Sequence, residues 1–194
     1  MTYYATTISG PLDQGDILAP VDLRDYFLWW QDGDKRPIVI VTPACDLAQE
    51  KTDYHRICVL KPLPLLLYAV GQQMGLKKDH WDGQALVSKG KKGDFTQKIR
   101  QAITNGLLRY HFLPSDGNVF KTDYFIDFEI LTSVPLDKLS VENRIARLNP
   151  PYKQELIQRL GVHLMRIGTP DIPEAHVHSL IDTYIGQTKL KFAA

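Results

Sequence analysis

Residues 37–49 read PIVIVTPACDLAQ, and this stretch decides the fold. Its four consecutive β-branched residues, at positions 38–41, predict a strand that is buried on both faces. The strand stops before Pro43, and Cys45 and Asp46 follow directly. A thiol and a carboxylate at the end of a buried strand are candidates for chemistry, so this corner is the first place to look for a site.

The composition is that of an ordinary globular domain. The chain has 194 residues, of which 44% are hydrophobic and 23% charged, and this length predicts one domain with a sizeable core. The formal net charge of +1 gives no global field that would draw the protein to nucleic acid or a membrane. No apolar run reaches the roughly 18 residues of a membrane span, and the first residues lack the pattern of a secretory signal. Only two cysteines are present, so we expect a soluble protein of the reducing cytoplasm.

Short strands around the opening stretch predict an antiparallel sheet. Strands are expected at 16–20 and 55–60, and Asp-Gly at 32–33 is typical of a hairpin turn. In residues 124–131 apolar and polar side chains alternate, which indicates a strand with one buried face. Two further strands are predicted at 108–113 and 144–148. The strands therefore predict an antiparallel barrel or curled sheet.

Helical patterns interrupt and close these strands. One helix is predicted to follow Pro62 and to end at Gly75. A second is predicted to begin near Asp94, whose carboxylate can cap it, and to end by Gly106. The leucine stripe at 151–167 predicts a third. The expected α+β chain has barrel strands at about 14–62 and 107–148, a helical insertion at about 63–106, a C-terminal helix at about 150–168 and a tail at 169–194.

Three short motifs follow one another in the first third of the chain. Gly15-Asp16 opens the first expected strand, Arg36-Pro37 opens the apolar strand, and RICVLKP follows at 56–62. In this order they resemble the small barrels of the MazF/PemK toxin family, over roughly residues 14–62. The resemblance implies a small SH3-like antiparallel barrel. The rest of the chain looks like prokaryotic proteins without an assigned activity.

The resemblance also implies candidate catalytic residues. In that family an arginine and a threonine carry out phosphodiester cleavage, and the arginine corresponds to Arg36, which would stabilise charge on the phosphate. Asp46 and His55 are the nearest candidates for an acid or base. The threonine position falls near Lys61-Pro62, where the chain has no hydroxyl. The resemblance therefore implies a non-catalytic binding or regulatory module of a bacterial toxin–antitoxin or phage-defence system, with a metal-independent endoribonuclease as the alternative.

Cys45 has three interpretations. It can be a nucleophile if His55 serves as its base. It can ligate zinc with His55, Cys58 and Asp46, although the tight Cys-x2-Cys spacing of many structural zinc sites is absent. It can also fill a small buried site while Asp46 accepts backbone N–H groups and fixes the turn. The last interpretation is favoured, so no metal and no other cofactor is assigned.

The segment 77–100 is rich in lysine. Its seven basic residues stand against three aspartates, a local excess of +4. This pattern predicts either a solvated loop with Trp81 folded onto the barrel, or a phosphate-binding surface on which Trp81 and Phe95 stack against bases. The candidate nucleic-acid contacts are Lys77, Lys78, Lys89, Lys91, Lys92, Lys98 and Arg100.

Five large side chains crowd into residues 26–30, with the sequence YFLWW. Such a cluster mostly belongs to the hydrophobic core, but it can also leave an exposed apolar patch that binds a partner protein. We therefore expect a protein partner, with nucleic acid as the second candidate and no membrane contact. The oligomeric state stays open.

Overall fold

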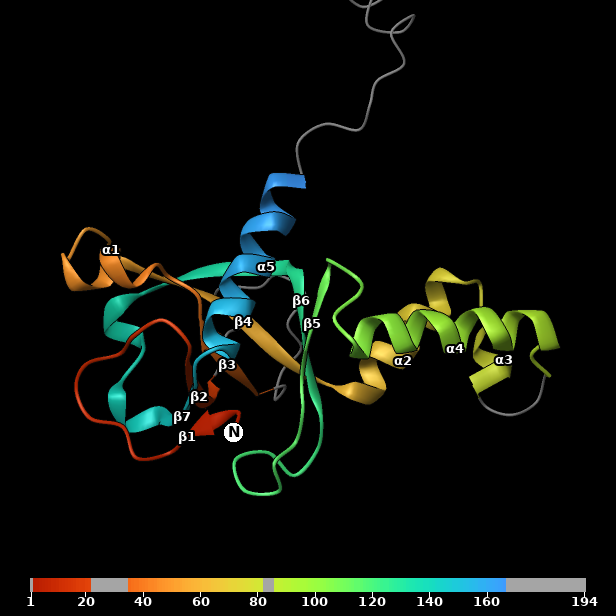
Figure 1. The fold of residues 1–194 in the computed structure, drawn as a ribbon, viewed down its shortest axis with the longest axis horizontal. Coiled ribbons are helices and arrows are strands. Elements are labelled where there is room, and N and C mark those ends of the chain that lie inside the picture. The colour runs from red at the N-terminus through yellow and green to blue at the C-terminus, as the bar shows by residue number, and fades with distance from the viewer. Residues whose placement is uncertain (1, 22–34, 82–85, 167–194) are drawn as a thin grey trace, which may run out of the picture. The chain divides into compact units, whose positions relative to one another are not determined.

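The computed structural model describes residues 2–21, 35–81 and 86–166 (Figure 1). Two blocks that contain all the described strands flank a segment of three helices. In chain order they are β1 (Tyr4–Ala5), β2 (Asp16–Val21), β3 (Arg36–Ile40), α1 (Ala44–Ala48), β4 (Tyr54–Pro62), α2 (Leu63–Gln73), α3 (Lys78–Trp81), α4 (Lys89–Ile103), β5 (Tyr110–Leu113), β6 (Tyr124–Pro135), two 3₁₀ turns (Leu136–Lys138 and Val141–Asn143), β7 (Arg144–Leu148) and α5 (Tyr152–Arg166).

The seven described strands form one curled, half-barrel sheet in the order β1-β7-β2-β3-β4-β6-β5. Every pairing is antiparallel. The opening stretch supplies β3 at its centre, where Ile38 lies opposite Val59 and Ile40 lies opposite Ile57. The α+β class and the antiparallel curled sheet are thus confirmed.

The centre of the sheet, formed by β3 and residues 57–60 of β4, is buried on both faces, as the run of β-branched residues predicts for β3. On one face Val39 and Cys58 join a core that includes Leu156 and Leu160 of α5. On the other face Ile38, Ile57 and their neighbours form a second core. Partly buried side chains of Leu12 and Leu47 pack against that second core, which places α1 over it.

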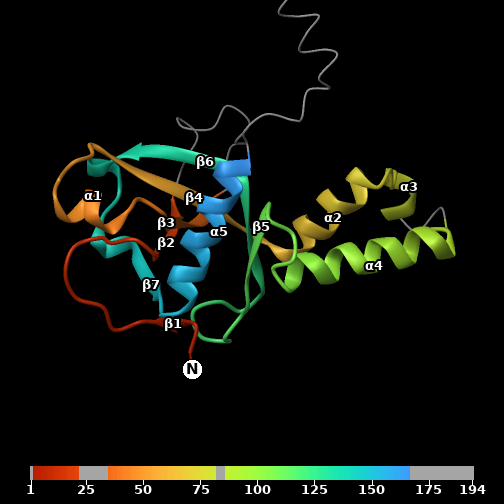
Figure 2. The ribbon, with the colours of Figure 1, turned by 45° about the horizontal axis from the view of Figure 1, so that its top comes forward.

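The insertion is a helical module in which α2 and α4 run side by side (Figures 1 and 2). It packs on β5 and β6 through a third core that contains Leu66, Val70, Ala102, Tyr110 and Phe125. This core joins the module to the sheet.

The predicted start of α4 near Asp94 is wrong by five residues. The helix begins at Lys89, and the Ser88 hydroxyl accepts the Lys91 N–H as its cap. Gly90 and Gly93 lie within the first turns and hide the helical signal, because glycine is among the poorest helix formers. The helix therefore begins after a serine cap and has two glycines, which have low helix propensity, in its first turns.

Side chains of α5 hold the chain where the helical module returns to the sheet. Arg159 donates hydrogen bonds to the backbone carbonyls of Asn105, Leu107 and Tyr110. The side-chain amide of Asn105 donates to Glu155 and its carbonyl oxygen accepts the Phe112 N–H. These bonds fix the entry into β5.

Some predictions fall outside the described residues. They concern the aromatic cluster at 26–30, most of the hairpin turn at 31–36 and the tail at 169–194. Among the described helices, none combines the length and apolarity needed to cross a bilayer.

Candidate functional site

The three predicted catalytic residues do not lie together. Arg36 begins β3, whereas His55 lies beyond the opposite end of that strand, since Ile40 is paired with Ile57. The four residue steps from Arg36 to Ile40 alone span about 13 Å. Asp46 is on α1, which follows the same far end of β3. Arg36 is therefore separated from both proposed partners by the length of the strand.

His55 is buried, with 5% of its surface exposed. Burial lowers the pKa of its imidazole, and the Asp16 carboxylate opposes that shift only in part. Its Nδ1 has no hydrogen-bond partner among the described residues. A buried imidazole with a lowered pKa is poorly placed to exchange protons with a substrate.

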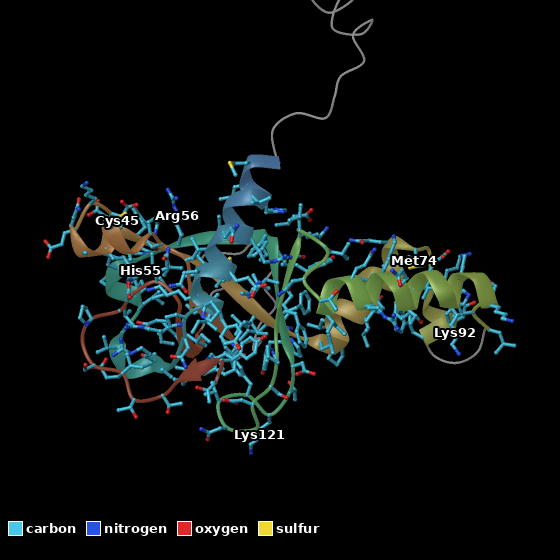
Figure 3. The ribbon with its side chains drawn as sticks, viewed as in Figure 1. Cys45, His55, Arg56, Met74, Lys92 and Lys121 are labelled. Atoms are coloured by element: carbon cyan, nitrogen blue, oxygen red, sulfur yellow. The ribbon has the colours of Figure 1, made fainter. Side chains whose placement is uncertain are left out.

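The prediction that Cys45 fills a small buried site is wrong. The Cys45 side chain is exposed on α1, and its Sγ lies 3.6 Å from the Asp46 carboxylate, to which the thiol donates (Figure 3). Pro43 is the N-cap of the short helix α1, which takes the place of the expected turn. Asp46 therefore contacts the neighbouring thiol.

The weak zinc alternative places its ligands on different sides of the sheet. Cys58 is fully buried in the core that α5 covers, and burial raises the pKa of its thiol to about 12. His55 precedes it by three residues on the same strand, so the two side chains point to opposite faces. In residues 2–21, 35–81 and 86–166 no group of three His, Cys, Asp or Glu side chains is arranged to hold a metal ion.

A buried ion cluster that sequence reasoning missed lies at the start of β2. Asp16 is completely buried and accepts hydrogen bonds from Arg147, at 2.5 and 2.9 Å, and from Arg144 at 3.1 Å. Arg144 also donates to backbone carbonyls of the 8–11 segment. The cluster fastens the N-terminal segment to β7. The sequence contains two signals of this cluster. Asp16 is an acidic residue at the first position of the otherwise apolar β2, and β7 has two arginines three positions apart.

A cavity of about 380 Å³ lies between that segment and α1, and Arg147 forms part of its wall. Arg147 is already held by two oxygens of Asp16. The Asp13 carboxylate in the same wall lies 3.9 Å from that guanidinium, so the described lining offers an anionic ligand no cation without a carboxylate partner.

Five of the seven basic residues of the insertion lie on α4, and one of them, Lys92, is labelled in Figure 3. Phe95, Ile99 and Ala102 form the side of α4 that packs into the module core. The cations occupy the rest of the helix surface. The exposed ones are Lys89, Lys91, Lys92, Lys98 and Arg100, with Lys77 just before α3. The side chain of Lys78 is outside the described set.

Two aromatic side chains are exposed beside these cations. Tyr68 is 44% and Trp81 37% exposed, and their ring centroids are 5.4 Å apart. The alternative that Trp81 folds onto the barrel is wrong, because its indole packs on Gly71 of α2 and edge-on to Phe95 of α4. Phe95 is partly buried in the module core, so of the two predicted stacking residues Trp81 is the more accessible.

Among the described residues, the helical module therefore carries exposed cations and exposed aromatic groups, whereas the catalytic candidates Arg36, Asp46 and His55 do not lie together. No protein-family model and no curated protein matches this chain.

Proposed function

We propose that this protein is a nucleic-acid-binding module that contacts phosphates through α4. One observation carries the proposal. Five exposed cations lie along the 15 residues of α4, and among the described residues none of the five forms an ion pair with a carboxylate. Cations that have no carboxylate partner in the described part of the chain are available to a polyanion, and counterion release then drives association.

The arrangement of these cations favours a long, flexible ligand over a single phosphate. At 100° per residue, Lys91 and Lys98 lie within about 20° of each other, and so do Lys89 and Arg100. The two pairs are on different sides of the helix. A nucleic acid strand can follow both sides, whereas one phosphate group can neutralise only one of them.

The barrel forms part of the same proposal. We assign it to the SH3-like, MazF/PemK-like class and to a toxin–antitoxin or phage-defence setting, which the order of Gly15-Asp16 and Arg36-Pro37 at the starts of β2 and β3 supports. The separation of Arg36 from His55 favours the non-catalytic form over the endoribonuclease. A protein partner at residues 26–30 stays a prediction.

The test compares two double variants by fluorescence anisotropy with a labelled single-stranded oligonucleotide. Lys91→Gln with Lys98→Gln removes two α4 cations. Each phosphate contact contributes about fivefold to affinity at roughly 0.1 M salt, so the pair should weaken binding about 25-fold. The matched control is Lys51→Gln with Lys121→Gln, which removes two exposed lysines outside the insertion and should leave the affinity unchanged.

Two results would contradict the proposal. One is the absence of salt-sensitive binding by the wild-type protein. The other is an equal loss of affinity in both double variants, which would place the contact elsewhere. The same protein is incubated with single-stranded RNA without added metal, and cleavage that Arg36→Ala abolishes would establish the endoribonuclease instead.

A further inference from the structure

A cavity of about 250 Å³ opens within the helical module, between α3 and the first turns of α4. Its described lining is mostly apolar, with two polar groups. The lining residues are Leu76, His80, Trp81, Val87, Lys92 and Phe95. The cavity is smaller than the 300–1,000 Å³ or so that takes a drug-sized ligand, and it suits one planar ring system.

The aromatic wall of the cavity is held in place by its neighbours. Trp81 and Phe95 meet edge to face, with ring centroids 6.1 Å apart and planes at 74°. On its other side the Trp81 indole lies so close to Gly71 that a Cβ there would be 2.3 Å from Cζ2. Position 71 therefore needs a residue without a side chain for the indole to occupy this site. Such packing orients one aromatic face before any ligand binds.

The polar groups of the lining are donors. Lys92 supplies an ammonium group on α4. His80 accepts the Lys77 N–H at Nδ1, at 3.1 Å, and the Asp79 carboxylate lies 3.2 Å from the same atom. With Nδ1 as the acceptor, the ring proton is on Nε2 and can be donated from that atom. A ring with acceptor atoms that is attached to a negatively charged chain complements both groups.

We propose that this cavity receives an unstacked nucleobase of a single-stranded nucleic acid, with Trp81 as the stacking surface and Lys92 beside the adjoining phosphate. The inference rests on the proposed binding function, and it specifies that the ligand is single-stranded and not duplex nucleic acid. Base stacking on an aromatic side chain is tolerant of sequence, because every base has a π-face. In a duplex the bases are already stacked and paired, so they cannot enter without being unpaired.

The experiment uses the full chain and three probes with the same number of phosphates per strand. They are a labelled thymidine oligonucleotide of about ten nucleotides, the usual scale of a single-strand site, the same oligonucleotide with abasic sugars in its central part, and a duplex of the same length. The wild-type protein should bind the intact single strand about tenfold more tightly than the abasic strand. It should also prefer the single strand to the duplex.

Substitution then assigns the preference to the cavity. Trp81→Leu should lower the affinity for the intact strand about tenfold and leave the affinity for the abasic strand unchanged. Tyr54→Leu, which removes a half-exposed tyrosine outside the insertion, is the matched control and should change neither affinity. A thermal melt checks that each variant is folded. If Trp81→Leu does not fold, the wild-type comparison of intact with abasic strand still decides whether the protein contacts bases, and equal binding of the two strands overturns the inference.

The outcomes separate this inference from the proposed function. Equal, salt-sensitive binding of the intact and abasic strands overturns the base site and leaves phosphate binding through α4 standing. Binding of none of the probes overturns both. A preference for the intact strand that survives Trp81→Leu places the base contact at another residue and overturns the assignment to this cavity.

Discussion

Asp16 shows how one residue determines the course of the chain at the edge of the fold. It is the first residue of β2 and is fully buried, yet two arginines and the Asp13 N–H surround its carboxylate. A buried charge is tolerated only with such compensation. The cluster thus stores little net stability by itself, but removal of one partner leaves the others unpaired.

Asp16→Asn should therefore be strongly destabilising. We expect a loss of about 3–5 kcal/mol in the free energy of unfolding, because the buried Arg144 loses its carboxylate partner and Arg147 keeps only Asp13, at 3.9 Å. Urea denaturation measures it. The control is Asp137→Asn, whose carboxylate is largely exposed and 3.8 Å from Lys138, and which should change stability by less than about 1 kcal/mol. Equal effects of the two substitutions would show that the buried cluster has no special role.

At the scale of the element, α5 covers a polar part of the core that has incomplete hydrogen bonding. The Phe128 ring lies 6.3 Å from the His111 ring and 5.7 Å from the His163 ring. Nδ1 of His111, Nε2 of His163 and Nε of Arg159 have no partner among the described residues. Burial, assisted by the Arg159 charge, lowers the pKa of His111 to about 3. This interface therefore holds His111 as a neutral imidazole.

Acid should weaken the fold through His111. Its folded pKa of about 3 lies below the unfolded value of 6.5, so the unfolded chain binds the extra proton and stability falls as the pH drops below about 6.5. This single group lowers the free energy of unfolding by about 1.4 kcal/mol per pH unit in that range. Urea denaturation at pH 8 and pH 5 measures the difference, which should be about 2 kcal/mol from His111.

His111→Leu should reduce the dependence on pH without removing all of it. The pKa of His55 is also lowered by burial, so that residue keeps a contribution in the variant. Stability at pH 8 should fall little, because the substitution replaces a buried group that has an unpartnered nitrogen by an apolar one. An unchanged difference between pH 8 and pH 5 would show that His111 does not titrate in this way.

The sequence predicted the strongly periodic elements and missed those determined by tertiary contacts. The runs that became β3, β7 and α5 have regular apolar patterns, and these elements lie within a few residues of the predicted ranges. The start of α4 was missed because two glycines follow its serine cap. The helix α1 was missed because a helix of five residues is too short to show an apolar periodicity. Charge identified the lysine surface, but the contacts of Trp81 with Gly71 bring together residues ten apart and leave no local pattern.

At the scale of the whole molecule, the charge is divided unevenly. The insertion at 63–106 carries seven basic residues and three aspartates, a net charge of +4, while the whole chain has +1 and the rest therefore has −3. A small total charge thus conceals a basic module. A polyanion is attracted to one part of the chain and repelled by the remainder, which should confine binding to the module.

This division predicts the salt dependence of binding. The logarithm of the affinity should fall with the logarithm of salt concentration, with a slope of about −0.7 for each phosphate contact on a single strand. Neutralising Lys91 and Lys98 together should make the slope shallower by about 1.4. A titration of affinity against potassium chloride measures it. Neutralising Lys51 and Lys121 instead should leave the slope as in wild type, and a change there would indicate contacts on the barrel.

The bonds between α5 and the chain leading into β5 have a consequence for self-association. β5 is the last strand of the described sheet, and its outward-facing groups include the Phe112 N–H and the Tyr110 carbonyl. Asn105 and Arg159 occupy these two groups, which are the ones a strand from another molecule would need. The protein thus closes a sheet edge with side chains, and this protects it against the edge-to-edge growth that leads to fibrous aggregates.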